Sequence, residues 1–245
     1  MIGYGPEYSE EYYRDNGQSG DRPALRWYTR LVRRYCVPDR GGAGPYLDFG
    51  CGTGHLLRRL AALGPAAGFE VSPWAAEAAR ATAPGAVVYE RLVDLPAHAF
   101  GVVVAVHVVE HLDDDAVATA LDTWRRVLVP GGRALGATPD PEGRGHAISG
   151  ARWVGAADPT HVNLKPHARW RELLVAHGFT VIREGTDGLW NVPYGRPAQV
   201  FGTARGTCCG PPRRSRSTSP GGWCCRRGRG SRRCSSWSGP ARTDR

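Results

Sequence analysis

Cysteine is scarce in the first 204 residues of this 245-residue chain, which contain only Cys36 and Cys51. Two cysteines build no disulfide framework, so we expect this part of the chain to fold in a reducing cytoplasm. Apolar runs close to the roughly 18 residues of a membrane span are absent, and the first residues lack the apolar stretch of a secretion signal. The sequence therefore predicts neither a membrane segment nor export.

Valine, isoleucine, leucine, methionine, phenylalanine and tyrosine are missing altogether from residues 205–245. This segment holds 11 arginines against one aspartate, whereas residues 1–204 hold 21 Lys+Arg and 22 Asp+Glu. A segment of this composition cannot bury a core, and we predict that it is a disordered tail. Because the remainder is nearly neutral, any argument from positive charge to nucleic acid concerns the tail alone.

The tail has several interpretations. Its adjacent cysteines, at 208–209 and 224–225, do not match the spacing of a zinc site, whereas its arginines would suit RNA or DNA. Residues 1–204 contain 20 arginines and one lysine, which indicates a GC-rich coding sequence, and a shifted reading frame of such DNA would have the composition of the tail. We favour the shifted frame, in which case the last strand of the fold comes from residues 196–204 or is missing.

Strands and helices are predicted to alternate along the chain. Each expected strand is a short apolar run, and each expected helix carries apolar residues at helical spacing. The expected strands are 45–50, 67–71, 86–89, 102–108, 133–138 and 179–183, and the expected helices begin near residues 22, 56, 72, 113 and 166. This order predicts an α/β fold, a Rossmann-like, doubly wound, mostly parallel sheet with helices on both faces.

A glycine-rich turn follows the first expected strand. Gly50, Gly52 and Gly54 allow a ligand to approach the backbone closely, and the next helix offers free N–H groups. His55 stands where the dinucleotide fingerprint G-x-G-x-x-G needs a small residue, which argues against a hydride-transferring enzyme. Glu70 ends the second strand, 20 residues after Gly50, where a carboxylate can accept hydrogen bonds from both hydroxyls of a ribose.

Four segments, taken in order, resemble the successive motifs of class I S-adenosylmethionine-dependent methyltransferases. They are Leu-Asp-Phe-Gly-Cys-Gly-Thr-Gly at 47–54, Gly-Phe-Glu-Val-Ser-Pro at 68–73, Val-Ala-Val-His-Val-Val-Glu-His-Leu at 104–112 and Leu-Val-Pro-Gly-Gly-Arg at 128–133. The resemblance extends from about residue 44 to residue 190. It implies S-adenosylmethionine as the cofactor.

The resemblance also assigns residues to this cofactor. The glycine turn would lie under its methionine part, and Glu70 would hold its ribose. Asp94 would lie near the adenine amino group, and His107 would line the methionine end. The full implied set of cofactor-binding residues is Asp48, Gly50, Cys51, Gly52, Gly54, Glu70, Val71, Asp94, Leu95 and His107.

Histidines are the candidate catalytic residues, because histidine is the natural base near neutral pH. His107 and His111 follow the fourth expected strand, and His161 lies in the long connection 139–165, a candidate substrate loop. We assign the base to His161, with a structural hydrogen bond as the alternative. The pattern His107-x-x-Glu110-His111 plus His161 also resembles the metal ligands of ubiquinone-pathway and small-RNA O-methyltransferases, so the binding of a divalent ion stays open.

The N-terminal aromatic residues Tyr8, Tyr12, Tyr13, Trp27 and Tyr28 have two interpretations. They would form a lid over the pocket, or they would pack a helix onto the sheet. With the lid, the chain divides into three parts, an N-terminal helical lid at 1–43, a cofactor-binding methyltransferase domain at 44–204 and the tail at 205–245.

These observations predict a methyltransferase that acts on oxygen or nitrogen of a small-molecule acceptor, in bacterial secondary or sugar metabolism such as antibiotic biosynthesis. We expect a cytoplasmic protein with no nucleic-acid or membrane partner, and the sequence is compatible with a homodimer. One alternative is a nucleic-acid methyltransferase that uses the tail. Another is a cofactor-binding protein without catalytic activity, against which the retained Gly50, Gly52, Glu70 and Asp94 argue.

Overall fold

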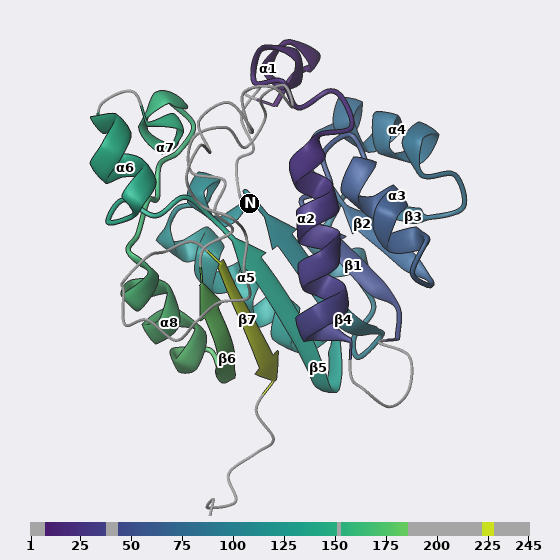
Figure 1. Ribbon diagram of the computed structural model, residues 1–245. Coiled ribbons are helices and arrows are strands. Elements are labelled where there is room, and N and C mark those ends of the chain that lie inside the picture. Colours follow the sequence, from purple (N-terminus) through teal and green to yellow (C-terminus); the bar gives the residue numbers. More distant parts are fainter. Residues whose placement is uncertain (1–7, 38–43, 151–152, 186–221, 228–245) are drawn as a thin grey trace, which may run out of the picture.

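A seven-stranded sheet organises the part of the chain that the computed structural model describes, namely residues 8–37, 44–150, 153–185 and 222–227 (Figure 1). The strands are β1 (Tyr46–Phe49), β2 (Ala66–Phe69), β3 (Val87–Tyr89), β4 (Phe100–Val106), β5 (Leu128–Ala137), β6 (Phe179–Gly185) and β7 (Gly222–Arg227). Their order across the sheet is β3-β2-β1-β4-β5-β7-β6. The strands β1 to β5 run parallel, and β7 is antiparallel to both of its neighbours. The strand order reverses between β1 and β4, which is the switch point of a doubly wound sheet.

Helices connect the strands. They are α1 (Glu10–Asp15), α2 (Pro23–Leu31), α3 (His55–Ala61), α4 (Pro73–Thr82), α5 (Asp114–Val127), α6 (Arg144–Ser149), α7 (Val154–Ala157) and α8 (His167–Ala176). A π-helical turn at Val32–Cys36 continues α2, and 3-10 turns occupy Leu92–Asp94 and Val109–His111. Within the described ranges, no helix is both long enough and apolar enough to cross a membrane.

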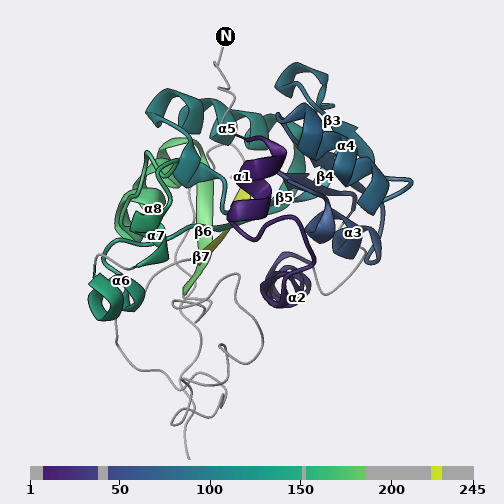
Figure 2. The same cartoon turned by 90° about the horizontal axis from the view of Figure 1, so that it is seen from above.

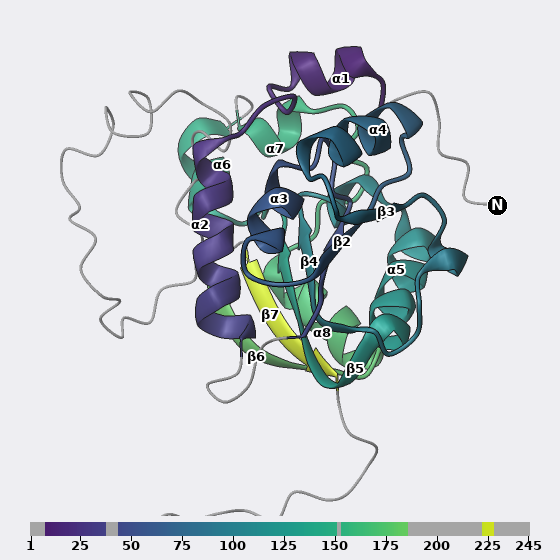
Figure 3. The ribbon, with the colours of Figure 1, turned by 90° about the vertical axis from the view of Figure 1, so that its right-hand side faces the viewer.

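Alternate residues of β4 are buried against two different helix layers. Val102 and Val104 belong to the core that includes α2 and α3, whereas Val103 and Ala105 pack in the core formed with α5 and α8. Figure 3 shows α2 and α5 on opposite sides of the sheet. A strand covered on both faces must be apolar throughout, which explains the valine-rich sequence of β4. The predicted doubly wound α/β fold is confirmed.

Capping side chains confirm two of the predicted helix starts. The Ser72 hydroxyl accepts a hydrogen bond from the Ala75 N–H at the start of α4. The Asp113 carboxylate accepts a 2.8 Å hydrogen bond from the Ala116 N–H at the start of α5. Such caps satisfy N–H groups that the first helical turn leaves unpaired. Each cap therefore fixes where its helix begins at the carboxyl edge of the sheet.

The strand β4 ends at Val106, short of the predicted end at residue 108. His107 adopts φ +56°, in the left-handed region, which ends the extended conformation. Its N–H donates to the Ala137 carbonyl at the end of β5, at 2.8 Å, and this bond holds the bend. The chain then enters the 3-10 turn Val109–His111, so the side chains of this turn lie over the carboxyl edge of the sheet.

The long connection predicted at 139–165 contains the short helices α6 and α7 (Figure 2). Its first residues are tied to the start of α8, because the Asp140 carboxylate accepts from the backbone N–H of His167 at 3.1 Å. Its last residues return to the sheet edge, where the Asn163 N–H donates to the Glu110 carbonyl at 3.0 Å. The connection therefore lies beside the turn that follows β4.

The strand β7 overturns part of the prediction for the tail. Residues 222–227 pair with β5 on one side and β6 on the other, so 205–245 is not disordered throughout. The prediction rested on apolar side chains, whereas this pairing is made by backbone groups that any residue type except proline carries. The remainder of the tail, and the segment 196–204 that was predicted as the last strand, lie outside the described residues.

We predict that removal of β7 destabilises the fold, because it leaves the facing backbone groups of β5 and β6 without partners. A chain that ends at residue 204 should unfold at a temperature roughly 5 °C or more below that of the full chain, since each kcal/mol lost lowers the midpoint by about 2–4 °C in a domain of this size. The matched control ends at residue 227 and keeps β7. Thermal unfolding of the three chains, followed by circular dichroism, tests this prediction. Equal unfolding temperatures for the chains that end at 204 and at 227 would contradict the pairing of β7 with β5 and β6.

Candidate active site

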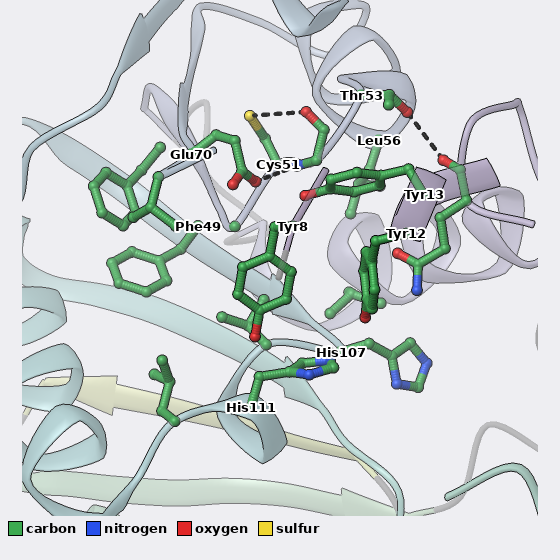
Figure 4. A pocket seen from close by; sticks show the side chains of 18 of the residues that line it. Tyr8, Tyr12, Tyr13, Phe49, Cys51, Thr53, Leu56, Glu70, His107 and His111 are labelled. Carbon is green, nitrogen blue, oxygen red and sulfur yellow. Dashed lines mark hydrogen bonds between the residues drawn. The ribbon is translucent and has the colours of Figure 1, made fainter. Parts of the chain in front are cut away.

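A cavity of about 400 Å³ opens at the carboxyl ends of β1, β2 and β4 (Figure 4). Its wall combines the glycine turn after β1, the end of β2, the bend after β4 and the N-terminal tyrosines. Open α/β sheets bind ligands at this edge, beside the switch point of the strand order. The volume lies within the range of small-molecule and cofactor sites, about 300–1,000 Å³.

The glycine turn needs glycine at each of its three positions. Gly50, Gly52 and Gly54 have backbone φ values of +76°, +50° and +82°, which residues with a Cβ rarely adopt. A Cβ on Gly50 would lie 2.6 Å from a methyl carbon of Val108, and one on Gly54 would lie 2.7 Å from the Ala79 Cα. The turn is thus a close-packed backbone surface, and Gly50 and Gly52 both line the cavity.

Glu70 joins this turn to the end of β2. One carboxylate oxygen, Oε2, accepts from the Gly52 N–H at 2.8 Å, and the other, Oε1, accepts from the Ser72 N–H at 2.9 Å. Glu70 is only 5% exposed, and burial raises its pKa, while the hydrogen bonds from Ser72 and Gly52 oppose that rise. The result is a carboxyl group held rigidly at the cavity wall, as a ribose-binding acid requires.

Six of the ten predicted cofactor-binding residues line the cavity, namely Gly50, Cys51, Gly52, Glu70, Val71 and His107. Gly54 instead packs closely against Ala79 of α4. Asp48 is buried behind the turn, burial raises its pKa, and its Oδ2 has no hydrogen-bond partner among the described residues. Neither Gly54 nor Asp48 lines the cavity.

The structure does not bring Asp94 or Leu95 to the cavity. Leu95 is 1% exposed and belongs to the core, and the exposed Asp94 points its Oδ2 toward the Arg91 Nε at 3.4 Å. Leu92, at the start of the same 3-10 turn, lines the cavity instead. Asp94 and Leu95 were predicted from their positions in the family motif. Because the chain forms a tight 3-10 turn here, Leu92 is the residue that contacts the cavity, and no sequence pattern pointed to it.

His107 lines the opposite wall with both ring nitrogens already engaged. Its Nδ1 lies 3.0 Å from Glu110 Oε1, and its Nε2 lies 3.1 Å from the Tyr28 hydroxyl. Glu110 is fully buried, and burial alone would raise its pKa, but the hydrogen bond and charge of His107 bring the pKa below its ordinary value. His107 is therefore fixed in orientation by the Glu110 carboxylate and Tyr28.

His111 lines the cavity beside Tyr8, whose ring centroid lies 5.9 Å from that of the imidazole. Its Nδ1 lies 2.9 Å from the Thr160 Oγ1. Burial lowers the pKa of His111, which favours the neutral imidazole. A neutral imidazole on the cavity wall is the protonation state that a general base requires.

His161 does not line the cavity. Its Nδ1 lies 2.7 Å from the Gly155 carbonyl oxygen, and its ring centroid lies 4.7 Å from that of His111. It thus makes a structural hydrogen bond of the kind that the sequence left as the alternative, and it lies next to His111.

Glu110, His111 and His161 form a cluster that could hold a metal ion. Each offers one ligand atom, and these atoms all lie within 4.8 Å of one another. The Glu110 Oε2 is buried and has no hydrogen-bond partner among the described residues. Two imidazoles and one carboxylate are a usual ligand set for zinc or a similar transition metal. His107, the fourth residue of the predicted set, is outside this cluster.

The N-terminal segment covers the cavity and contacts both walls. On the side of the glycine turn, the Ser72 hydroxyl donates to the Tyr8 carbonyl at 2.7 Å, and the ring centroids of Tyr13 and Trp74 lie 5.5 Å apart. On the opposite side, the Tyr12 hydroxyl donates to Asp158 Oδ2 at 3.2 Å. Tyr8, Tyr12 and Tyr13 line the cavity, as a lid would, whereas Tyr28 is buried in the core.

The comparison with protein families identifies the class of enzyme independently of the cavity geometry. The family described as "Methyltransferase domain" matches residues 21–184, more than half of the chain. The chain therefore belongs to this family, and its fold and motifs make it a class I S-adenosylmethionine-dependent methyltransferase. A comparison with curated proteins finds no match.

Solved structures share this fold at low sequence identity. An S-adenosylmethionine-dependent methyltransferase from Mesorhizobium loti aligns with a TM-score of 0.55 at 20% identity, over 83% of this chain and 98% of the other. A protein of echinomycin biosynthesis, described as converting a disulfide bond into a thioacetal group, gives 0.56 at 21% identity, over 91% and 92%. Mitomycin 7-O-methyltransferase gives 0.61 at 17% identity, over 90% and 59%.

We predict that Glu70→Ala weakens the binding of S-adenosylhomocysteine by about 1.5–3 kcal/mol, the usual contribution of a hydrogen bond to a charged group. Isothermal titration calorimetry measures the loss. Glu77→Ala removes an acid of α4 whose side chain is 81% exposed, and it serves as the matched control. A Glu70→Ala protein that remains folded and binds with unchanged affinity would contradict the ribose assignment.

Proposed function

We propose that this methyltransferase acts on an oxygen or nitrogen of a small-molecule acceptor. The observation that carries the proposal is one cavity with two different walls. Glu70 and the glycine turn form the cofactor wall, while His107 and His111 form the wall that faces it. S-adenosylmethionine supplies an activated methyl group when bound, so the protein has to align the acceptor and accept its proton.

The cover over this cavity favours a small acceptor. Tyr8, Tyr12 and Tyr13 line it from the N-terminal side, and their contacts connect the segment to both walls. A polymer would need an open groove in place of this cover. The similarity to proteins of echinomycin and mitomycin biosynthesis is in keeping with an acceptor from secondary metabolism, such as an antibiotic precursor. Cys36 and Cys51 are both buried and form no disulfide with each other, in keeping with the reducing cytoplasm that we propose as its location.

His111 fits the role of base better than His161, to which the sequence assigned it. His111 reaches the cavity, whereas His161 is bonded to the Gly155 carbonyl behind it. His107 also reaches the cavity, but Glu110 and Tyr28 occupy its nitrogens. The alternative is a divalent ion held by Glu110, His111 and His161, which would act on the acceptor oxygen.

Incubation with labelled S-adenosylmethionine and a small-molecule extract of the producing organism tests the proposal. We predict label in a small molecule, and a fall in turnover of roughly a hundredfold or more in His111→Gln, the usual contribution of a positioned base. Cofactor affinity should not change. His146→Gln is the matched control, because His146 is exposed and outside the cavity wall. Label that enters only RNA or protein would contradict the proposed acceptor class.

Chelation separates the base from the metal alternative. With His111 as a base, a chelator leaves turnover unchanged, and His161→Gln has a smaller effect than His111→Gln. With a bound ion, the chelator and each substitution at Glu110, His111 and His161 abolish turnover, and an added divalent metal restores the chelated wild-type protein. Full turnover in both His111→Gln and the chelated protein would refute the base and the metal ion alike. Catalysis would then depend only on the alignment of acceptor and cofactor.

A further inference from the structure

A chain of hydrogen bonds runs from His111 away from the cavity. The His111 Nδ1 lies 2.9 Å from the Thr160 Oγ1, and this hydroxyl donates to Asp158 Oδ1 at 2.6 Å. The Thr160 N–H donates to the same carboxylate oxygen at 2.9 Å. Thr160 is thus held to Asp158 by its backbone and by its side chain.

The donors and acceptors of this chain determine the tautomer of His111. A threonine hydroxyl has one hydrogen, and here that hydrogen is given to Asp158. Toward the imidazole the hydroxyl can only accept, so the His111 Nδ1 must carry the proton. The His111 Nε2 is then the unprotonated nitrogen, and among the described residues it has no hydrogen-bond partner.

The Asp158 carboxylate is an acceptor at both of its oxygens. Its Oδ1 accepts from the Thr160 N–H and the Thr160 hydroxyl. The second oxygen, Oδ2, accepts from the Tyr12 hydroxyl at 3.2 Å and lies 3.8 Å from the His161 Nε2. Asp158 therefore connects the N-terminal segment that covers the cavity to the Thr160 hydroxyl.

We propose that Thr160 and Asp158 are positioning residues, which keep His111 in the tautomer whose Nε2 accepts the proton of the methyl acceptor. This inference rests on the proposed function. Bound S-adenosylmethionine would supply the methyl group, whose bond to sulfur would break with its electron pair left on sulfur as the acceptor oxygen or nitrogen bonds the methyl carbon. The acceptor proton moves to His111 Nε2, and the positive charge of the imidazolium is balanced through Thr160 by the Asp158 carboxylate.

Nitrogen-15 NMR of the full-length protein with labelled histidine tests the tautomer without any acceptor. His111 is identified as the signal that His111→Gln removes. We expect the wild-type protein to show a protonated Nδ1 and an unprotonated Nε2. In Thr160→Val, which keeps the shape but removes the hydroxyl, the two tautomers should mix, and Thr160→Ser should restore the wild-type pattern. A protonated Nε2 in the wild type, or an unchanged pattern in Thr160→Val, would overturn the proposal.

Turnover with labelled S-adenosylmethionine and the extract supplies a second readout. We expect Thr160→Val and Asp158→Asn to lower turnover about tenfold or more at unchanged S-adenosylhomocysteine affinity, with recovery in Thr160→Ser. Thr119→Val is the matched control, since its hydroxyl bonds the Asp115 carbonyl on the exposed face of α5. A wild-type protein that transfers no label defeats the proposed function, whereas full turnover in Thr160→Val defeats only the positioning role.

Discussion

The active site depends on the buried carboxylate of Glu70, which joins two strand ends that would otherwise be independent. Its oxygens accept from the Gly52 and Ser72 N–H groups, and beside it the N–H groups of Gly50 and Cys51 both donate to the Phe69 carbonyl, at 2.8 and 3.0 Å. These bonds hold the glycine turn against the end of β2. A buried acid is costly unless it is hydrogen-bonded, so the same bonds that position the turn also stabilise Glu70.

The opposite wall depends on the bend at the end of β4. The left-handed conformation of His107 turns the chain back, and Glu110 then lies under the cavity, where it bonds the His107 ring. His111 follows and reaches the cavity, while the connection that ends in α8 brings Thr160 to its Nδ1. The ends of β1 and β2 thus supply one half of the site and the end of β4 supplies the other, and the N-terminal tyrosines line the cavity between them.

The sequence predicted what is local and missed what depends on distant contacts. The glycine turn and the place of Glu70 at a strand end were predicted because positive φ values and a strand end leave a signature within a few residues, and their roles toward the cofactor stay predictions. His161 was assigned the base because it lies in the candidate substrate loop, and the sequence does not show how that loop folds, with the His161 Nδ1 2.7 Å from the Gly155 carbonyl oxygen. The strand β7 was missed because it pairs by its backbone with β5, far away in the chain.

Hydrogen–deuterium exchange with and without S-adenosylhomocysteine tests the central claim most directly, namely that one covered cavity at the carboxyl edge binds the cofactor. We predict slower exchange on binding in the glycine turn, at the start of α4 and in α1, because Gly52, Ser72 and the N-terminal tyrosines contact one another around that cavity. The surface helix α8 should exchange at an unchanged rate. Protection confined to segments away from the glycine turn, or none at saturating ligand, would contradict the account.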